Sequence, residues 1–216
     1  MDYSKFTVIL QKLTIVVDFQ KRSKTVFSAV TFAYFISIHT GQKPHAFSIE
    51  INQRNIGPQY ANIFMAMYPY HVPVGIAVRK ALEYEDSYDD AVVYLSEITL
   101  MAPVYFILAG VNPGEGVVIT RGRWDAVDIW RMNDTNSWYI VETNYDRWKP
   151  VPAYDNRRGA AERRMKQMTQ RKLTCTSLFR VLSKRPTNND GTIYTTVMSA
   201  RTPELLHSST RIRIKS

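Results

Sequence analysis

The most informative stretch of the sequence is Glu142-Thr143-Asn144-Tyr145-Asp146-Arg147-Trp148-Lys149-Pro150. Before it, Tyr139, Val141 and Thr143 alternate as in a partly buried strand, and the Lys149-Pro150 step ends any extended run. The stretch therefore predicts a strand over 138–144 that leads into a loop carrying an asparagine and several charges. A strand end of this kind is a good place for a binding or catalytic site.

On both sides of this stretch, blocks of strands alternate with blocks of helices. Strand signals cover 8–19, 25–39, 46–53, 104–109, 116–121, 126–131, 192–199 and roughly 206–214, and residues 40–44 are predicted as a turn. Helical signals cover 60–67, 74–84, 87–97, about 156–170 and 174–183. No repeat or change of composition divides the chain. The pattern predicts one domain over residues 1–216 with an α+β fold and mostly antiparallel sheets.

The cysteine and histidine content argues against a metal site. Cys175 is the one cysteine in 216 residues, so no disulfide framework forms within them, and the four histidines have no ligand spacing. We expect no metal and no cofactor. No run approaches the roughly 18 apolar residues of a membrane span, and Lys5, Gln11 and Asp18 interrupt any signal-peptide pattern at the N-terminus.

The net charge of +9 is concentrated in 157–172 and 211–215. The aromatic interleaving typical of nucleic-acid binding is missing, so we expect no nucleic-acid partner. Two interpretations remain open, a solvated helix face with a basic tail and a surface that favours anionic membranes.

Several motifs, in the same order, resemble the acid ceramidase and N-acylethanolamine acid amidase family, which are N-terminal-nucleophile hydrolases of lipid amides. They are the stretch 142–150 with 155–158, and residues 17–20, 24–27, 102–108, 114–121 and 192–199. The resemblance implies an αββα sandwich, with two stacked, mostly antiparallel sheets between helical layers. It also implies a lysosomal location, a lipid amide substrate, and that the chain is most of the catalytic (beta) subunit, partnered by the family's alpha subunit.

The resemblance departs at the N-terminus. The family's catalytic subunit begins with a cysteine, whose thiol attacks the amide while its own amino group acts as base. This chain opens at Met1-Asp2-Tyr3, so the strand carrying the nucleophile is expected to be missing and the chain alone is expected to be inactive. Cys175-Thr176-Ser177 looks like the nucleophile motif but lies mid-chain, which favours a structural thiol. The alternative function is a non-catalytic relative that binds lipid or another subunit.

Three residues are candidates for catalysis. Asn144 matches the family's oxyanion-binding asparagine; its alternative role is to cap its own turn. Asp2 matches the aspartate that binds the nucleophile's amino group, and the alternative is a solvated terminus. Arg157 matches an arginine that supports the asparagine, and otherwise is an ordinary residue at a helix start.

Substrate contacts are expected from Gln53, Phe64, Met67 and Tyr145. Gln53 stands where related enzymes have a glutamate, so a role that depends on charge is in doubt. The apolar stretch 63–70 predicts either a lip over an acyl-chain pocket that touches membranes or a buried helix.

Other residues are expected to have structural or conditional roles. Glu142 and Asp146 are predicted to pair with Arg147 or Arg157. Asn133-Asp134-Thr135 is a glycosylation sequon, usable in the secretory pathway.

Overall fold

The chain folds as an α+β sandwich in the computed structural model, which describes residues 3–58, 60–134, 136–153 and 155–209. One sheet has seven antiparallel strands that lie side by side in sequence order. Its strands are β1 (Thr14–Lys21), β2 (Lys24–Phe32), β3 (Thr40–Lys43), β4 (Phe47–Gln53), β5 (Val104–Ala109), β6 (Gly116–Arg121) and β7 (Ala126–Arg131). A second sheet pairs two short strands, β8 (Thr195–Val197) and β9 (His207–Ser209).

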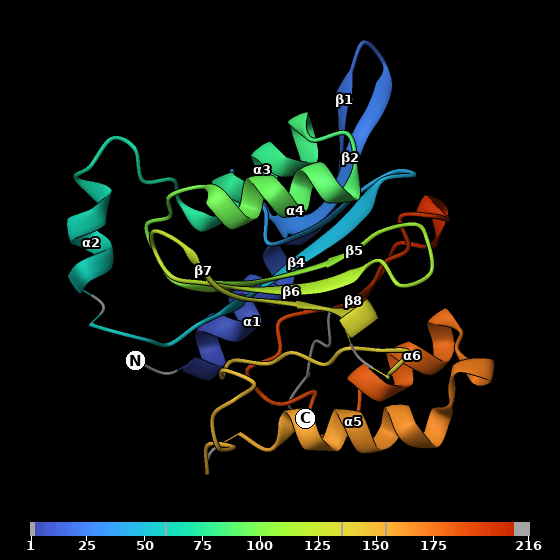
Figure 1. Cartoon of the computed structure of the whole chain (residues 1–216). Helices are drawn as coiled ribbons and strands as arrows, with labels where there is room; N and C mark the ends of the chain where they lie inside the picture. The colour runs from blue at the N-terminus through green and yellow to red at the C-terminus, as the bar shows by residue number, and fades with distance from the viewer. Residues whose placement is uncertain (1–2, 59, 135, 154, 210–216) are drawn as a thin grey trace.

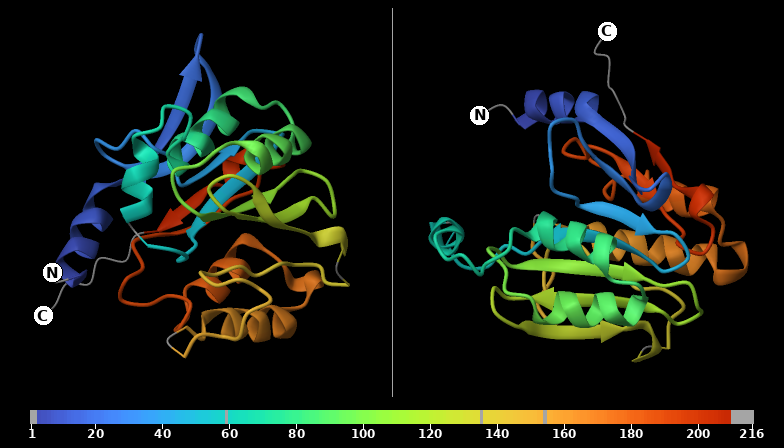
Figure 2. Two further views of the ribbon diagram at one scale, coloured as in Figure 1. Left: turned by 60° about the vertical axis from the view of Figure 1, so that its left-hand side comes forward. Right: turned by 90° about the horizontal axis from the view of Figure 1, so that it is seen from above.

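Helices lie around the two sheets. They are α1 (Tyr3–Leu13), α2 (Tyr60–Ala66), α3 (Val74–Tyr84), α4 (Tyr88–Glu97), α5 (Arg157–Met168) and α6 (Cys175–Leu182), with short 3₁₀ turns η1 (Met132–Asp134), η2 (Gln170–Lys172) and η3 (Pro203–Leu205). Helices α3 and α4 lie on one face of the large sheet, whereas β8, α5 and α6 lie on the other (Figure 1). Helix α2 stands out from the body in Figure 1 and in the right-hand view of Figure 2. Among the described residues, no helix is long and apolar enough to cross a bilayer.

The main hydrophobic core lies between the large sheet and α3 and α4. Phe47 and Ile49 of β4 and Phe106 of β5 are fully buried there against Leu82 and Leu95. Helix α4 begins as predicted, because the hydroxyl of Ser87 accepts a hydrogen bond from the Asp90 amide at 3.1 Å. Successive side chains of a strand point to opposite faces of the sheet. Because Phe47 and Ile49 of β4 face α3 and α4, Ser48 and Asn52 point the other way, toward the second layer.

Polar contacts join the second layer to that opposite face. The hydroxyls of Thr40 and Tyr194 lie 2.8 Å apart, and the Gln42 side chain donates to the Pro203 carbonyl at 2.7 Å. The same side chain accepts from the Ser199 amide at 3.1 Å. The predicted sandwich of antiparallel sheets between helical layers is confirmed, with a second sheet of two three-residue strands among the described residues.

The first predicted strand is wrong in its first half, because residues 8–13 belong to α1. Thr7 and Gln11 lie four residues apart, the spacing of one helix face, and both are buried. The Gln11 side chain donates to the Thr192 carbonyl at 2.9 Å, which holds this face against the end of the chain. Tertiary contacts therefore override the extended preference of Thr7, Val8 and Ile9.

The predicted turn at 40–44 is also wrong, because Thr40–Lys43 form β3 between β2 and β4. Gly41 misled the prediction. A Cβ atom at this position would lie 2.7 Å from Cδ1 of Leu82, so the glycine permits close packing of α3 on the sheet and does not mark a turn. The preceding strand ends at Phe32, well before residue 39.

Residues 138–144 do not form a strand. The Thr143 amide donates to the carboxylate of Glu142 at 2.7 Å, and the Tyr139 amide lies 3.4 Å from the Ser137 hydroxyl. Side chains thus satisfy backbone groups that a neighbouring strand would otherwise pair. The remaining helices and the strands β4 to β7 agree with their predictions to within two residues, whereas β8 is shorter than the strand predicted at 192–199. Strand β9 begins one residue after the start of the strand predicted at 206–214, whose residues 210–214 lie outside the described part of the chain.

Candidate active site

Asn144 lies where its loop meets the end of β4. Its Nδ2 donates to the Gln53 carbonyl at 2.8 Å, and its Oδ1 accepts from Nη2 of Arg157 at 2.8 Å. Because a guanidinium only donates, this contact fixes which end of the amide carries the N–H groups. The Gln53 carbonyl accepts one of the two Nδ2 hydrogens, and no other described residue accepts the second. That hydrogen is available to a ligand.

Arg157 is held in turn by Asp155. Its Nε and Nη2 donate to the two carboxylate oxygens at 2.8 and 2.5 Å, and its backbone amide donates to Oδ1 at 3.0 Å. These hydrogen bonds keep the pKa of Asp155 below its usual value and raise the pKa of Arg157. The structure therefore brings Asn144 and Arg157 together, in the arrangement that the resemblance implies for them.

A buried ion pair anchors the loop two residues beyond Asn144. Arg54, which follows Gln53, binds Asp146 through Nε at 2.7 Å and Nη2 at 3.0 Å. The Tyr105 hydroxyl donates to Asp146 at 2.7 Å, and Nζ of Lys149 lies 2.9 Å away. The predicted pairing of Asp146 with Arg147 or Arg157 is wrong. Neither Arg54 nor Tyr105 was predicted as a partner of Asp146.

Arg147 and Glu142 also have other partners than predicted. Arg147 pairs with Asp128 of β7 near the surface. Glu142 binds Arg158 at 2.5 Å, and burial raises the pKa of Glu142 despite this partner.

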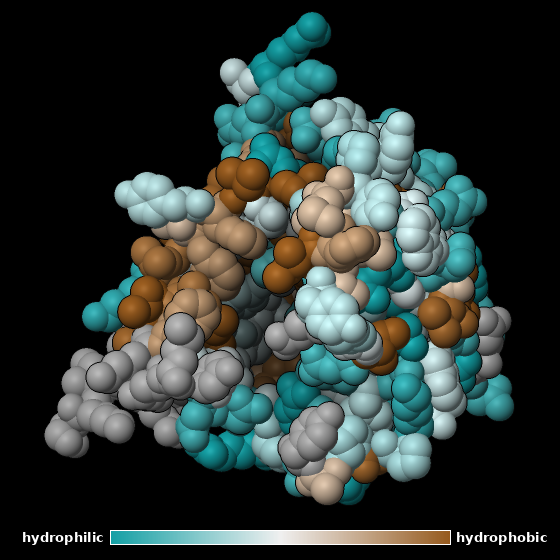
Figure 3. All heavy atoms as spheres, turned by 90° about the vertical axis from the view of Figure 1, so that its left-hand side faces the viewer, coloured by the Kyte–Doolittle hydropathy of each residue, from teal (hydrophilic) through white to brown (hydrophobic). Residues whose placement is uncertain are grey.

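The four predicted substrate contacts differ in exposure. Tyr145 is buried, with the Arg158 guanidinium 3.9 Å from its ring centroid, and Gln53 is exposed. Phe64 and Met67 are 53% and 68% exposed at α2 and just beyond its end, and no residue of α2 is buried, so the buried-helix interpretation of 63–70 is wrong. With Ile63 they contribute to an apolar face that also carries exposed residues of α1, and a hollow opens in this face (Figure 3).

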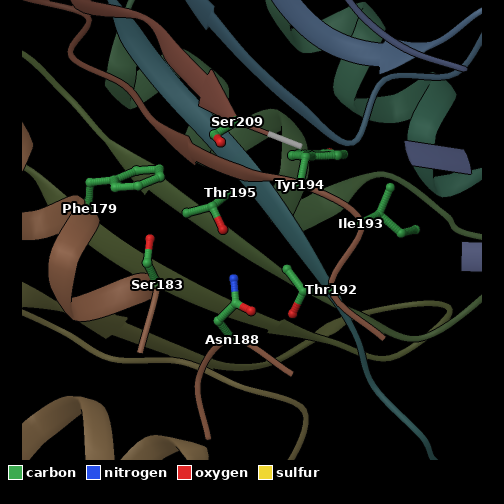
Figure 4. A pocket seen from close by; sticks show the side chains of 8 residues that line it. All are labelled: Phe179, Ser183, Asn188, Thr192, Ile193, Tyr194, Thr195 and Ser209. Atoms are coloured by element: carbon green, nitrogen blue, oxygen red, sulfur yellow. The ribbon is translucent and has the colours of Figure 1, made fainter. Parts of the chain in front are cut away.

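Cys175 is partly buried at the start of α6, where Thr174 and Ser177 cap the helix. It lines a cavity of about 260 Å³ that adjoins another of about 280 Å³ between α6 and the small sheet. Figure 4 shows Phe179 of α6 and Ser183, which follows α6, on one side of the larger cavity and Thr195 on the other. The polar side chains of the smaller cavity are hydroxyls and the Cys175 thiol, and those of the larger one are hydroxyls and the Asn188 amide. Neither lining includes Asn144 or Arg157.

Two further candidates fall wholly or partly outside the residues that the structure describes. Asp2 lies outside the described residues. Asn133 is exposed in η1, and Thr135 of its sequon lies outside the described residues. Within the described part of the chain, no three histidine, cysteine or acidic residues are grouped as a metal site would require.

Comparisons with known proteins point to the same family that the motifs resemble. The chain is 42% identical over 214 residues to N-acylethanolamine-hydrolyzing acid amidase of Oryctolagus cuniculus, and this covers 99% of the chain and 59% of that protein. It is 40% identical over 193 residues to acid ceramidase of Mus musculus, which covers 88% of the chain and 49% of that protein. The chain thus spans about half to three fifths of these relatives. No family model matches it.

A solved structure agrees with the sequence relatives. The Caenorhabditis elegans ortholog of N-acylethanolamine-hydrolyzing acid amidase superposes with a TM-score of 0.79 at 36% identity. The match covers 91% of this chain and 84% of that one. The likeness therefore extends through both layers of the sandwich.

Proposed function

Because this chain belongs to the family of N-acylethanolamine-hydrolyzing acid amidase and acid ceramidase, we propose that it is most of the catalytic subunit of a lipid amide hydrolase. The substrate class is an N-acylethanolamine or a ceramide, split by water into a fatty acid and an amine. The observation that carries the proposal is the Asn144 amide, oriented by Arg157 and left with one N–H to donate.

In the proposed reaction, Asn144 stabilises the oxyanion. When a nucleophile adds to the amide carbonyl, the negative charge on the oxygen is met by the second Nδ2 hydrogen. Arg157 contributes by holding Oδ1, so that the amide does not reorganise as the charge develops. Gln53 acts through its backbone carbonyl, and its neutral side chain supplies no acid or base.

The nucleophile would come from a segment outside these 216 residues. Cys175 is their one cysteine, and its nitrogen is in a peptide bond within the chain, so it has no free amino group to act as base. In the proposed mechanism, an N-terminal cysteine thiolate forms a thioester and its amino group passes the thiol proton to the leaving amine. Water then releases the fatty acid and restores the thiol. Asp2 would bind the amino group, and the family's alpha subunit would be the protein partner.

We expect the 216-residue polypeptide by itself to be inactive toward N-palmitoylethanolamine and ceramide, since it holds neither the nucleophile nor its base. The assay is fatty-acid release at acid pH with a thiol reductant, with heat-killed protein as control. Release above that control would refute the assignment of the nucleophile. A non-catalytic lipid-binding or subunit-binding relative is the second candidate, and the exposed apolar side chains of Phe64 and Met67 favour its lipid-binding form.

The apolar face around α2 is proposed to contact the membrane from which a lipid substrate is extracted, in a lysosome. Exposed Phe64 and Met67 would enter the interface. In the secretory route to that compartment, the exposed Asn133 would be glycosylated.

Replacing both Phe64 and Met67 by serine should lower sedimentation with anionic vesicles roughly tenfold, because about 1.4 kcal/mol of apolar insertion is lost. Val93 of α4 is likewise exposed, at 55%, and does not belong to α2, so Val93→Ser is the control. Equal losses in both variants would show that binding depends on general surface hydrophobicity and not on α2.

A further inference from the structure

A buried ion pair between Arg54 and Asp146 fixes the loop that carries Asn144 to the sheet. Each of its residues is close in sequence to one partner of the hydrogen bond between Asn144 and the Gln53 carbonyl. Arg54 directly follows Gln53, whose carbonyl accepts from Asn144, and Asp146 lies two residues after Asn144. The side chains of Arg54 and Asp146 are 5% and 2% exposed. A bidentate contact between a guanidinium and a carboxylate fixes the distance between the two groups and their relative orientation. The Arg54–Asp146 pair therefore sets the spacing between the end of β4 and the Asn144 loop.

We propose that Arg54 and Asp146 are positioning residues, which hold the end of β4 and the Asn144 loop at the spacing that aims the Asn144 amide. This inference rests on the proposed oxyanion role of Asn144. Two further side chains complete the arrangement. The Tyr105 hydroxyl of β5 and Nζ of Lys149 each bind a carboxylate oxygen of Asp146, and Nη1 of Arg54 donates to the Arg121 carbonyl at 3.2 Å.

The chemistry of the pair suits an acid compartment. Burial alone would raise the pKa of Asp146, but hydrogen bonds from Arg54, Tyr105 and Lys149 outweigh it and hold the pKa well below the usual 3.8. The pKa of Asp146 is lower in the folded chain than in the unfolded chain, so its charged form stabilises the fold. This stabilisation is complete at pH values above 3.8, the pKa of Asp146 in the unfolded chain. It is lost as the pH falls below 3.8 toward the pKa of Asp146 in the folded chain. The pair therefore stays charged where a lysosomal enzyme works.

The same loop offers a matched control. Arg147 binds Asp128 with the same two-pronged geometry, at 2.8 and 3.0 Å, but its side chain is 42% exposed and Asp128 lies on β7, away from Gln53. If any charge pair near Asn144 sufficed, Asp128→Asn would do as much damage as Asp146→Asn. If the position of the pair matters, only the second change should affect Asn144.

The first readout needs no turnover. In ¹⁵N-labelled 216-residue chain, the two Asn144 side-chain N–H resonances, assigned by their loss in Asn144→Ala, should be well separated and persist from neutral pH down to about 4. Asp146→Asn should merge or broaden them, Arg54→Lys should retain them in part, and Asp128→Asn should leave them unchanged. Unchanged resonances in folded Asp146→Asn protein would overturn the proposal.

The second readout is kinetic, in protein extended by a cysteine-first segment. Asp146→Asn should lower kcat by about tenfold or more with a smaller change in KM, because misplacing a catalytic group by about 1 Å costs up to about 10² in rate. Arg54→Lys should recover part of the loss. A fall in melting temperature with kcat unchanged in the folded fraction would make the pair merely structural. If the extended wild-type protein shows no turnover, the proposed function fails, while the resonances still decide whether the pair positions Asn144.

Discussion

Asn144→Ala in a catalytically complete form of the protein should lower kcat by about 10²–10³-fold while changing KM much less. The Asn144 amide is half-buried and its orientation is already fixed by Arg157 and Gln53, so it needs no rearrangement when negative charge appears on the substrate oxygen. A donor of this kind acts on the transition state more than on the bound substrate, and loss of one such donor typically has this effect on rate.

A remote asparagine provides the comparison. Asn112 also follows a strand, β5, and its side chain binds Glu115 at 2.6 Å in an exposed turn. Asn112→Ala should leave kcat and KM within about twofold, since surface changes away from a site usually cost little. If Asn144→Ala changed KM alone, Asn144 would position the substrate and would not stabilise the oxyanion. Equal kinetics for both variants would remove Asn144 from the reaction.

The parts of the fold that could be predicted are those in which local pattern and tertiary environment agree. Strands β5 to β7 were predicted to the residue, because they combine β-branched residues with clear turns on either side. Helix α4 was predicted because Ser87 and the acidic first turn mark its start. Helix α1 and strand β3 were missed because Gln11 and Gly41 have their roles only through partners about 181 and 41 residues away, Thr192 and Leu82.

In the candidate site too, contacts between residues close in the sequence could be predicted, whereas contacts between distant residues could not. The motif around Asn144 and the nearby Arg157 predicted a contact that the structure contains. Arg54 and Asp146, which form the buried pair, are 92 residues apart. Arg147 and Arg157 were predicted as partners of Asp146 because they are nearer in the sequence. The pairing of β4 with β5 would have indicated these partners, because Gln53 at the end of β4 pairs with Val104, the neighbour of Tyr105 in the sequence. Using it required the strand order, which periodicity alone does not provide.

We propose that these 216 residues supply the oxyanion site and the fold of a lipid amidase, and that a leading cysteine would complete it. The measurement is release of palmitate from N-palmitoylethanolamine at acid pH by the chain extended with the cysteine-first strand of a family enzyme. The control is the same protein with serine in place of that cysteine. We expect turnover by the first and at least about 10²-fold less by the second, because serine lacks an easily formed thiolate. A folded, monomeric extended protein with no turnover, or equal turnover by the serine form, would contradict the account.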